Sequence, residues 1–165
     1  MKHLLSLAIV AAASALAYVI ANKVTAEEDT DTQLANPVTV VSEKEFSEAG
    51  ITLSLPEEAV NVFWMTIKAI PLLYSLNFFV GKSECNLRLQ KSSNLRNLSG
   101  MYFPWTKEET VTDEGTRAVI QTSSDEAGIA LWYRNGYSIS LSMKNDVSVE
   151  KLDEMFRFFN GSMSI

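Results

Sequence analysis

The dipeptide Asn135-Gly136 is the sequence feature that most constrains how this chain can fold. Asparagine and glycine both tolerate positive φ angles, and the pair is typical of a type I′ turn that joins two antiparallel strands. Every second residue from Tyr137 to Met143 is apolar, and residues 127–134 before the turn are rich in apolar side chains. The sequence therefore predicts a tight β-hairpin whose apolar face is turned toward a hydrophobic core.

The same alternation recurs upstream of this hairpin. Residues 60–68, 72–80 and 85–89 alternate with a period of two, and residues 116–121 form another β-rich run. A shorter β-rich run stands at residues 38–41. Because hairpin connections dominate and strands do not alternate with helices, we expect the strands to pair antiparallel.

Two helices are predicted, one near each end of the domain. Ser42 and Glu45 have the spacing of a capping box and Gly50 can end a helix, so residues 43–49 are expected to form a short helix. Ser148 can cap a longer helix. Its apolar positions follow helical spacing: Val149, Leu152, Met155, Phe156 and Phe159. The predicted fold is α+β, with a twisted antiparallel sheet of about five or six strands. The C-terminal amphipathic helix is expected to pack on one face, beside the short N-terminal helix.

The first 26 residues have the pattern of an export segment. Lys2 precedes an apolar run from Leu4 to Ala21, and residues 24–26 are small or modest in size. Two interpretations fit this pattern, a signal peptide cleaved after Ala26 or a retained membrane anchor. Both place the domain outside the cytoplasm, as a protein that is secreted or anchored to the cell membrane by its N-terminal segment.

The remainder of the chain divides into a tether and one domain. Residues 27–37 are acidic, polar and aperiodic, which is typical of a flexible tether. Residues 38–165 are long enough for one hydrophobic core and too short for two independent ones. We therefore expect a single α+β domain over residues 38–165.

The residue types present exclude several kinds of chemistry. The only histidine is His3 in the leader and the only cysteine is Cys85, so the domain cannot form a Ser-His-Asp or Cys-His pair or a histidine-based metal site. The chain carries 20 acidic and 14 basic residues, a net charge of −6, which disfavours nucleic acid as a partner. We expect no catalysis, metal or cofactor. Cys85 alternates with Leu87 and Leu89, a pattern typical of a small buried side chain on a strand.

Five residues are candidates for binding a ligand or a partner. Tyr102, Phe103 and Trp105 lie in an aromatic segment that is expected to be a loop, where large side chains are readily exposed. Phe79 stands on a strand face that the alternation predicts to be polar. Arg88 projects from the face opposite Cys85 and can pair with an acid across the sheet.

Several short stretches occur in an order that resembles a family of exported or lipid-anchored domains of unknown function from Gram-positive gut bacteria. They are Asn36-Pro37, Gly50, Pro56-Glu57-Glu58-Ala59, Arg88, the aromatic segment 99–105 and the segment 132–141. The resemblance covers most of residues 36–159. It implies the fold and the location but no activity, and this chain departs from the family in lacking a lipobox cysteine.

Three hypotheses for function follow. The first is a non-enzymatic extracytoplasmic domain that binds an unknown envelope protein or a small apolar ligand at the bacterial cell envelope. The second is a lipid or peptide carrier or sensor with an apolar cavity. Its mouth would be formed by Phe78, Phe79, Tyr102 and Trp105. The third and weakest is a carboxylate-dependent hydrolase that uses an acidic segment with Glu108, Glu109 and Asp113.

Overall fold

The computed structural model describes residues 37–124 and 126–165, which belong to one compact unit. The predicted leader, and the tether apart from Pro37, lie outside the described residues. Eight strands and two helices are described. They are β1 (Val38–Val41), α2 (Glu43–Glu48), β2 (Ala59–Ile67), β3 (Leu73–Val80), β4 (Ser83–Lys91), β5 (Lys107–Asp113), β6 (Thr116–Ser123), β7 (Ala127–Arg134), β8 (Tyr137–Lys144) and α3 (Val149–Ser162).

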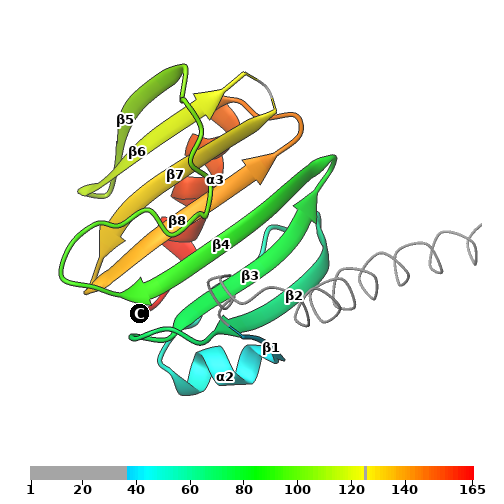
Figure 1. Cartoon of the computed structure of the whole chain (residues 1–165), viewed down its shortest axis with the longest axis vertical. Coiled ribbons are helices and arrows are strands. Elements are labelled where there is room, and N and C mark those ends of the chain that lie inside the picture. Colours follow the sequence, from blue (N-terminus) through cyan, green and yellow to red (C-terminus); the bar gives the residue numbers. More distant parts are fainter. Residues whose placement is uncertain (1–36, 125) are drawn as a thin grey trace, which may run out of the picture. The chain divides into compact units, whose positions relative to one another are not determined.

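All eight strands form one antiparallel sheet, in the order β1-β2-β3-β4-β8-β7-β6-β5. The sheet consists of two four-stranded meanders, β1–β4 and β5–β8, which are joined where β4 pairs with β8 (Figure 1). The predicted turn at Asn135-Gly136 joins β7 to β8, and both residues have positive φ angles. The antiparallel sheet and the C-terminal helix are thus confirmed.

The predicted number of strands was wrong, because the sheet has eight strands rather than five or six. The strand that the sequence pattern did not reveal is β5, whose sequence KEETVTD contains one apolar residue. It pairs with β6 along its whole length and forms one edge of the sheet. An edge strand can be highly polar because much of its surface faces solvent.

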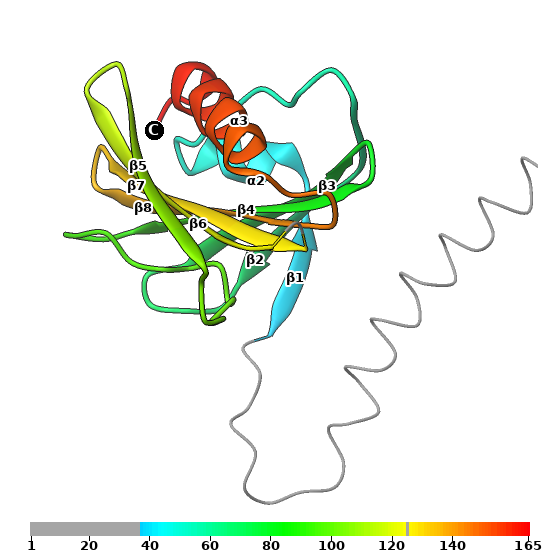
Figure 2. The same cartoon turned by 90° about the horizontal axis from the view of Figure 1, so that it is seen from above.

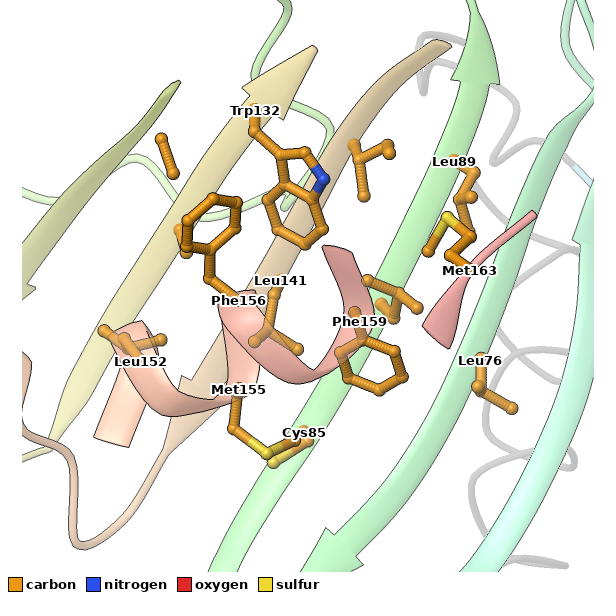
Figure 3. Packing of buried hydrophobic residues seen from close by; sticks show 14 of the residues in the cluster. Leu76, Cys85, Leu89, Trp132, Leu141, Leu152, Met155, Phe156, Phe159 and Met163 are labelled. Carbon is orange, nitrogen blue, oxygen red and sulfur yellow. The ribbon is translucent and has the colours of Figure 1, made fainter. Parts of the chain in front are cut away.

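Helix α3 packs against one face of the sheet and covers the hydrophobic core. Both helices lie on the same side of the sheet in Figure 2. Trp132 on β7 contacts Phe156 edge to face with ring centroids 5.3 Å apart, and Phe78 on β3 contacts Phe159 at 5.9 Å. Figure 3 shows Trp132, Phe156 and Phe159 near Leu89 of β4 and Leu141 of β8. The large fully buried side chains therefore gather between α3 and this face, which we call the helix face.

Helix α2 closes the core near the other edge of the sheet. Ser42 and Glu45 form the predicted capping box, and Phe46 is completely buried. The Phe46 ring contacts Trp64 on β2 and Tyr74 on β3, with centroid distances of 4.8 and 5.1 Å. The short helix thus adds one large buried side chain, Phe46, to the core on the helix face. Among the described residues, none of the helices has the length and apolar character needed to cross a membrane.

Candidate functional site

The face of the sheet opposite the helices is divided into a covered half and an open half. The loop of residues 92–106 crosses this face in front of β7 and β8, while within residues 37–124 and 126–165 no segment crosses in front of β2 and β3 (Figure 1). Ser138 on β8 donates a hydrogen bond to the Arg96 carbonyl at 2.9 Å and accepts one from the Arg96 amide at 2.6 Å. Ser140 accepts a bond from the Leu98 amide at 2.8 Å. We call this side the loop face.

Arg88 holds the loop from the neighbouring strand. Its Nη1 atom donates a hydrogen bond to the Leu98 carbonyl at 2.9 Å. The same atom lies 3.1 Å from the position that a Cβ atom would occupy at Gly100, a residue with positive φ. A side chain at position 100 would therefore press on the guanidinium group. This geometry makes Arg88, one of the five predicted binding residues, a residue that positions the loop.

The aromatic segment of the loop is partly exposed and partly packed. Tyr102 is 79% exposed and Phe103 is 48% exposed. Trp105 is half-buried and contacts Phe103 edge to face, with ring centroids 5.7 Å apart. It also packs on a small apolar cluster of the loop face: Met101, Ala127, Ile129 and Leu131. Trp105 thus anchors the loop to β7, while Tyr102 and Phe103 remain accessible.

The open half of the loop face carries a continuous row of apolar side chains. We call this row the open patch; it comprises Val38, Val40, Val60, Phe63, Met65, Ile67 and Phe79. Val38, Val40, Val60 and Phe63 are exposed at 55%, 67%, 53% and 44%. Cross-strand pairs connect the row, because Val40 stands opposite Met65 and Val60 stands opposite Phe79. None of these seven residues is charged.

A strip of polar side chains separates the open patch from the loop. Asn86 on β4 donates through Nδ2 to Ser75 Oγ at 2.9 Å and to Asn77 Oδ1, both on β3. The Asn86 Oδ1 atom is buried and has no hydrogen-bond partner within the described part of the chain. Buried polar atoms are normally paired, so this strip retains one unused acceptor beside the apolar row.

The five predicted binding residues thus fall into two groups on the same face. Phe79 belongs to the open patch, whereas Arg88, Tyr102, Phe103 and Trp105 belong to the loop layer. Sequence analysis missed the exposed residues of β1 and β2. A signal was present, because once Trp64 is placed inward, Phe63 and Met65 must project from the opposite face of β2.

The carboxylates of the hydrolase hypothesis do not converge. Glu108 and Glu109 are consecutive on β5, so their side chains leave opposite faces of the sheet. Glu108 accepts a hydrogen bond from Gln121 at 2.6 Å and Glu109 pairs with Lys107 at 2.6 Å. Asp113 pairs with Arg157 at 3.2 Å and also binds Asn160. Each carboxylate is therefore engaged in a separate local interaction.

Cys85 is completely buried on the helix face, as its alternation with leucines predicts. Burial, and to a smaller extent the negative charge of Glu84, raise the pKa of its thiol to about 12. A thiol with so high a pKa is a poor nucleophile at neutral pH. Over residues 37–124 and 126–165, no group of three or more acidic, cysteine or histidine side chains is placed to hold a metal ion.

A shallow cleft of about 560 Å³ lies where the loop meets the ends of β6 and β7. Its lining residues are Leu95, Gly115, Thr116, Arg117, Val119, Tyr133, Arg134 and Asn135. The Tyr133 hydroxyl already donates to the Ser92 carbonyl at 3.1 Å, and Arg134 donates to the Asn160 carbonyl on α3. The polar groups of both side chains are thus used within the fold.

Comparison with known proteins adds no family to this description. No family model matches the sequence, and no curated protein or solved structure is detectably similar to it. The resemblance to exported domains of Gram-positive bacteria therefore stays an expectation from the sequence. The class that the fold itself defines is an α+β domain with an eight-stranded antiparallel sheet, one face covered by helices and the other half open.

Proposed function

We propose that this protein is a non-enzymatic binding domain that works at the cell envelope, outside the cytoplasm. The observation that carries the proposal is the open patch, an uncharged apolar row on a sheet face that the loop leaves uncovered. Scattered exposed hydrophobic residues are ordinary, but a contiguous apolar patch on a soluble domain marks an interaction surface. The export-like leader is the support for the location.

The binding hypothesis is favoured over the carrier hypothesis by the placement of neighbouring phenylalanines. Phe78 is fully buried on the helix face against Phe159, whereas Phe79 projects from the loop face. Tyr102 and Trp105 also belong to the loop face. In a carrier, these four residues would have to line the entrance of one cavity. Residues on opposite faces of a sheet cannot line the same entrance. The separated carboxylates likewise favour binding over hydrolysis.

The proposal is tested by photocrosslinking in cells that make the protein. Phe63 is replaced by a photoreactive phenylalanine analogue in the full chain, and the cells are irradiated. A matched control carries the same analogue at Tyr133, an exposed aromatic residue over the covered half of the same face. We expect a discrete crosslinked species from position 63 and none from position 133. Equal labelling at both positions, or no crosslink from position 63, would overturn the proposal.

The location is tested separately on the same cells. Fractionation followed by mass spectrometry gives the N-terminus of the mature chain and the compartment that holds it. We expect the domain in the envelope or the medium, beginning at Glu27 if the leader is cleaved and at Met1 if it is retained as an anchor. Recovery of the chain in the cytosolic fraction would contradict the proposal.

A further inference from the structure

We infer that the open patch is an interface between two copies of this chain, which pack with their loop faces toward each other. The inference rests on the proposed function, because it names the partner of the same surface. Three features support the inference: the apolar area of the patch, its lack of charge, and the loop of residues 92–106, which stands out from the sheet beside the patch (Figure 2).

The patch is large enough for a stable contact between copies. Its four most exposed side chains present together on the order of 400 Å², taking roughly 150–250 Å² for a large side chain in the open. Two copies would therefore remove on the order of 800 Å² from water through these residues alone. The half-buried Met65, Ile67 and Phe79 add to this area, toward the roughly 1,000 Å² that a specific interface requires.

The charge distribution favours contact between two copies at the open patch. The chain has a net charge of −6, so two copies repel each other through most approaches. The seven residues of the open patch are uncharged. Like charges facing each other across an interface cost several kcal/mol, and an uncharged patch avoids that cost. A two-fold contact needs a surface that is complementary to itself, and an apolar, neutral sheet face meets this condition.

The loop decides the direction of the two-fold axis. Packed sheets lie about 10 Å apart, so a segment lying on one sheet must pass beside the other. An axis in the plane between the sheets and perpendicular to the strands would bring the two loops onto each other. An axis parallel to the strands, placed over the boundary of β2 and β3, sets β2 of one copy against β3 of the other and separates the loops.

The strand order then places the loop of one copy beside the free edge of the other. β8 stands one strand position farther from this axis than β1 does. The loop above β8 in one copy therefore falls about 5 Å beyond β1 in the second copy. The cross-strand pairs show which residues lie at the same height along the strands. Ser138 on β8 is level with Val38 on β1, and Ser140 is level with Val40. Because Arg96 is bonded to Ser138, it comes beside Val38 of the second copy.

This arrangement also covers the edge of β1. β1 has the sequence VTVV, and its four residues include no charge or proline, two of the devices that protect an edge strand. The opposite edge, β5, is protected by Lys107, Glu108, Glu109 and Asp113. A second copy whose loop lies along β1 covers this edge, with which no described strand pairs on its outer side. The raised loop of residues 92–106 and the outer edge of β1 thus form two complementary parts of one surface that can pair with itself.

The test uses introduced cysteines in the full chain, expressed in its own cells and treated with a short bis-maleimide. The native Cys85 does not interfere, because it is completely buried. Phe63→Cys is placed near the axis, and Thr110→Cys, an exposed position on β5, is the matched control. We expect a crosslinked species of twice the chain mass from Phe63→Cys and not from Thr110→Cys. Two differently tagged chains, one with Val38→Cys and one with Arg96→Cys, are expected to crosslink to each other.

The outcomes separate this inference from the proposed function. A crosslink from Phe63→Cys to a different protein, without the species of twice the chain mass, overturns the second copy as partner and leaves the binding function in place. No crosslinked species from Phe63→Cys overturns the second copy as partner, and the photocrosslinking experiment at position 63 decides the binding function separately. Equal dimer formation from Thr110→Cys shows random collision and overturns the interface. A dimer from Phe63→Cys without the mixed Val38–Arg96 product overturns the axis parallel to the strands.

Discussion

The Cδ1 atom of Leu152 on α3 lies 2.7 Å from the position that a Cβ atom would occupy at Gly128 on β7. Val147 Cγ1 lies 2.8 Å from the same position. Gly128 is therefore a point of close approach between the sheet and the segment that leads into α3. Because position 128 has no side chain, Leu152 can be completely buried against β7.

We predict that Gly128→Ala destabilises the domain, because a methyl group there displaces Leu152 and Val147 from their packed positions. Overpacking of this kind costs roughly 1–3 kcal/mol. Gly161→Ala is the matched control, since nothing lies within 4 Å of a Cβ atom at that helical position. Urea denaturation of the two variants checks the prediction. Equal stability of both variants would show that α3 moves freely on the sheet.

A second prediction concerns the hydrogen bond from Arg88 to the Leu98 carbonyl. Arg88→Ala should release the loop of residues 92–106 while the sheet stays folded. Loss of a charged, part-buried hydrogen bond of this kind corresponds to roughly a tenfold rise in loop opening. The readout is the rate of trypsin cleavage after Arg96 in the native protein, with Arg117→Ala as the control on the exposed surface of the same face. Unchanged cleavage at Arg96 would show that the other contacts of the loop, among them the hydrogen bonds to Ser138 and Ser140, hold it without Arg88.

A third prediction follows from the pKa of about 12 of the buried Cys85 thiol. The thiol stays protonated in the folded state above its ordinary pKa of about 9, whereas the unfolded chain loses the proton there. The contribution of Cys85 to stability is therefore fully present below pH 9 and falls as the pH rises toward 12, by about 1.4 kcal/mol per pH unit. Urea denaturation between pH 8 and pH 11 should show a steeper loss for the native chain than for Cys85→Ala.

The same burial predicts the reactivity of this thiol. At pH 8 the folded protein should react with iodoacetamide far more slowly than the protein in urea, because alkylation requires the exposed thiolate. Rapid alkylation of the native protein would contradict the burial of Cys85. Tyr74 and Tyr137, whose pKa values are also raised by burial, add to the alkaline loss of stability in the native chain and in Cys85→Ala alike.

A fourth prediction concerns Asn160, which links α3 to two strands. Its side-chain Nδ2 atom donates to Asp113 Oδ2 on β5 at 2.8 Å, and its backbone carbonyl accepts from Arg134 on β7. Asn160→Ala should destabilise the domain by roughly 1–3 kcal/mol and raise hydrogen exchange selectively in β5. Glu154→Ala, an exposed position on the same helix, is the control. A uniform rise of exchange across the sheet would show that the link is not local to β5.

The elements with a strong local pattern could be predicted from the sequence. The Asn135-Gly136 turn is set by backbone preference within two residues, and the terminal helix by the spacing of Leu152, Met155, Phe156 and Phe159, which are all buried. β5 could not be predicted in the same way. Its ladder with β6 is formed by backbone groups, and backbone pairing leaves no trace in the pattern of side chains.

The candidate site was only partly predictable for a related reason. Phe79 stood out because it is apolar on a face expected to be polar, and the structure places it in the open patch. The exposure of Phe63 and Val40 depends on where the loop of residues 92–106 lies. Hydrogen bonds to Ser138 and Ser140, more than 40 residues away in sequence, hold that loop in place. A polar, aperiodic segment carries no local sign of such distant partners.

The pairing of β4 with β8 has a consequence for how the chain is made. The first meander ends at Lys91, but Phe78 within it is covered by Phe159, which lies close to the C-terminus. A chain that emerges from the ribosome N-terminus first thus leaves Phe78 without its aromatic partner until α3 has appeared. We therefore expect the first meander to gain much of its stability only after α3 has been made. The sheet can be completed by β8, but its core is complete only with α3.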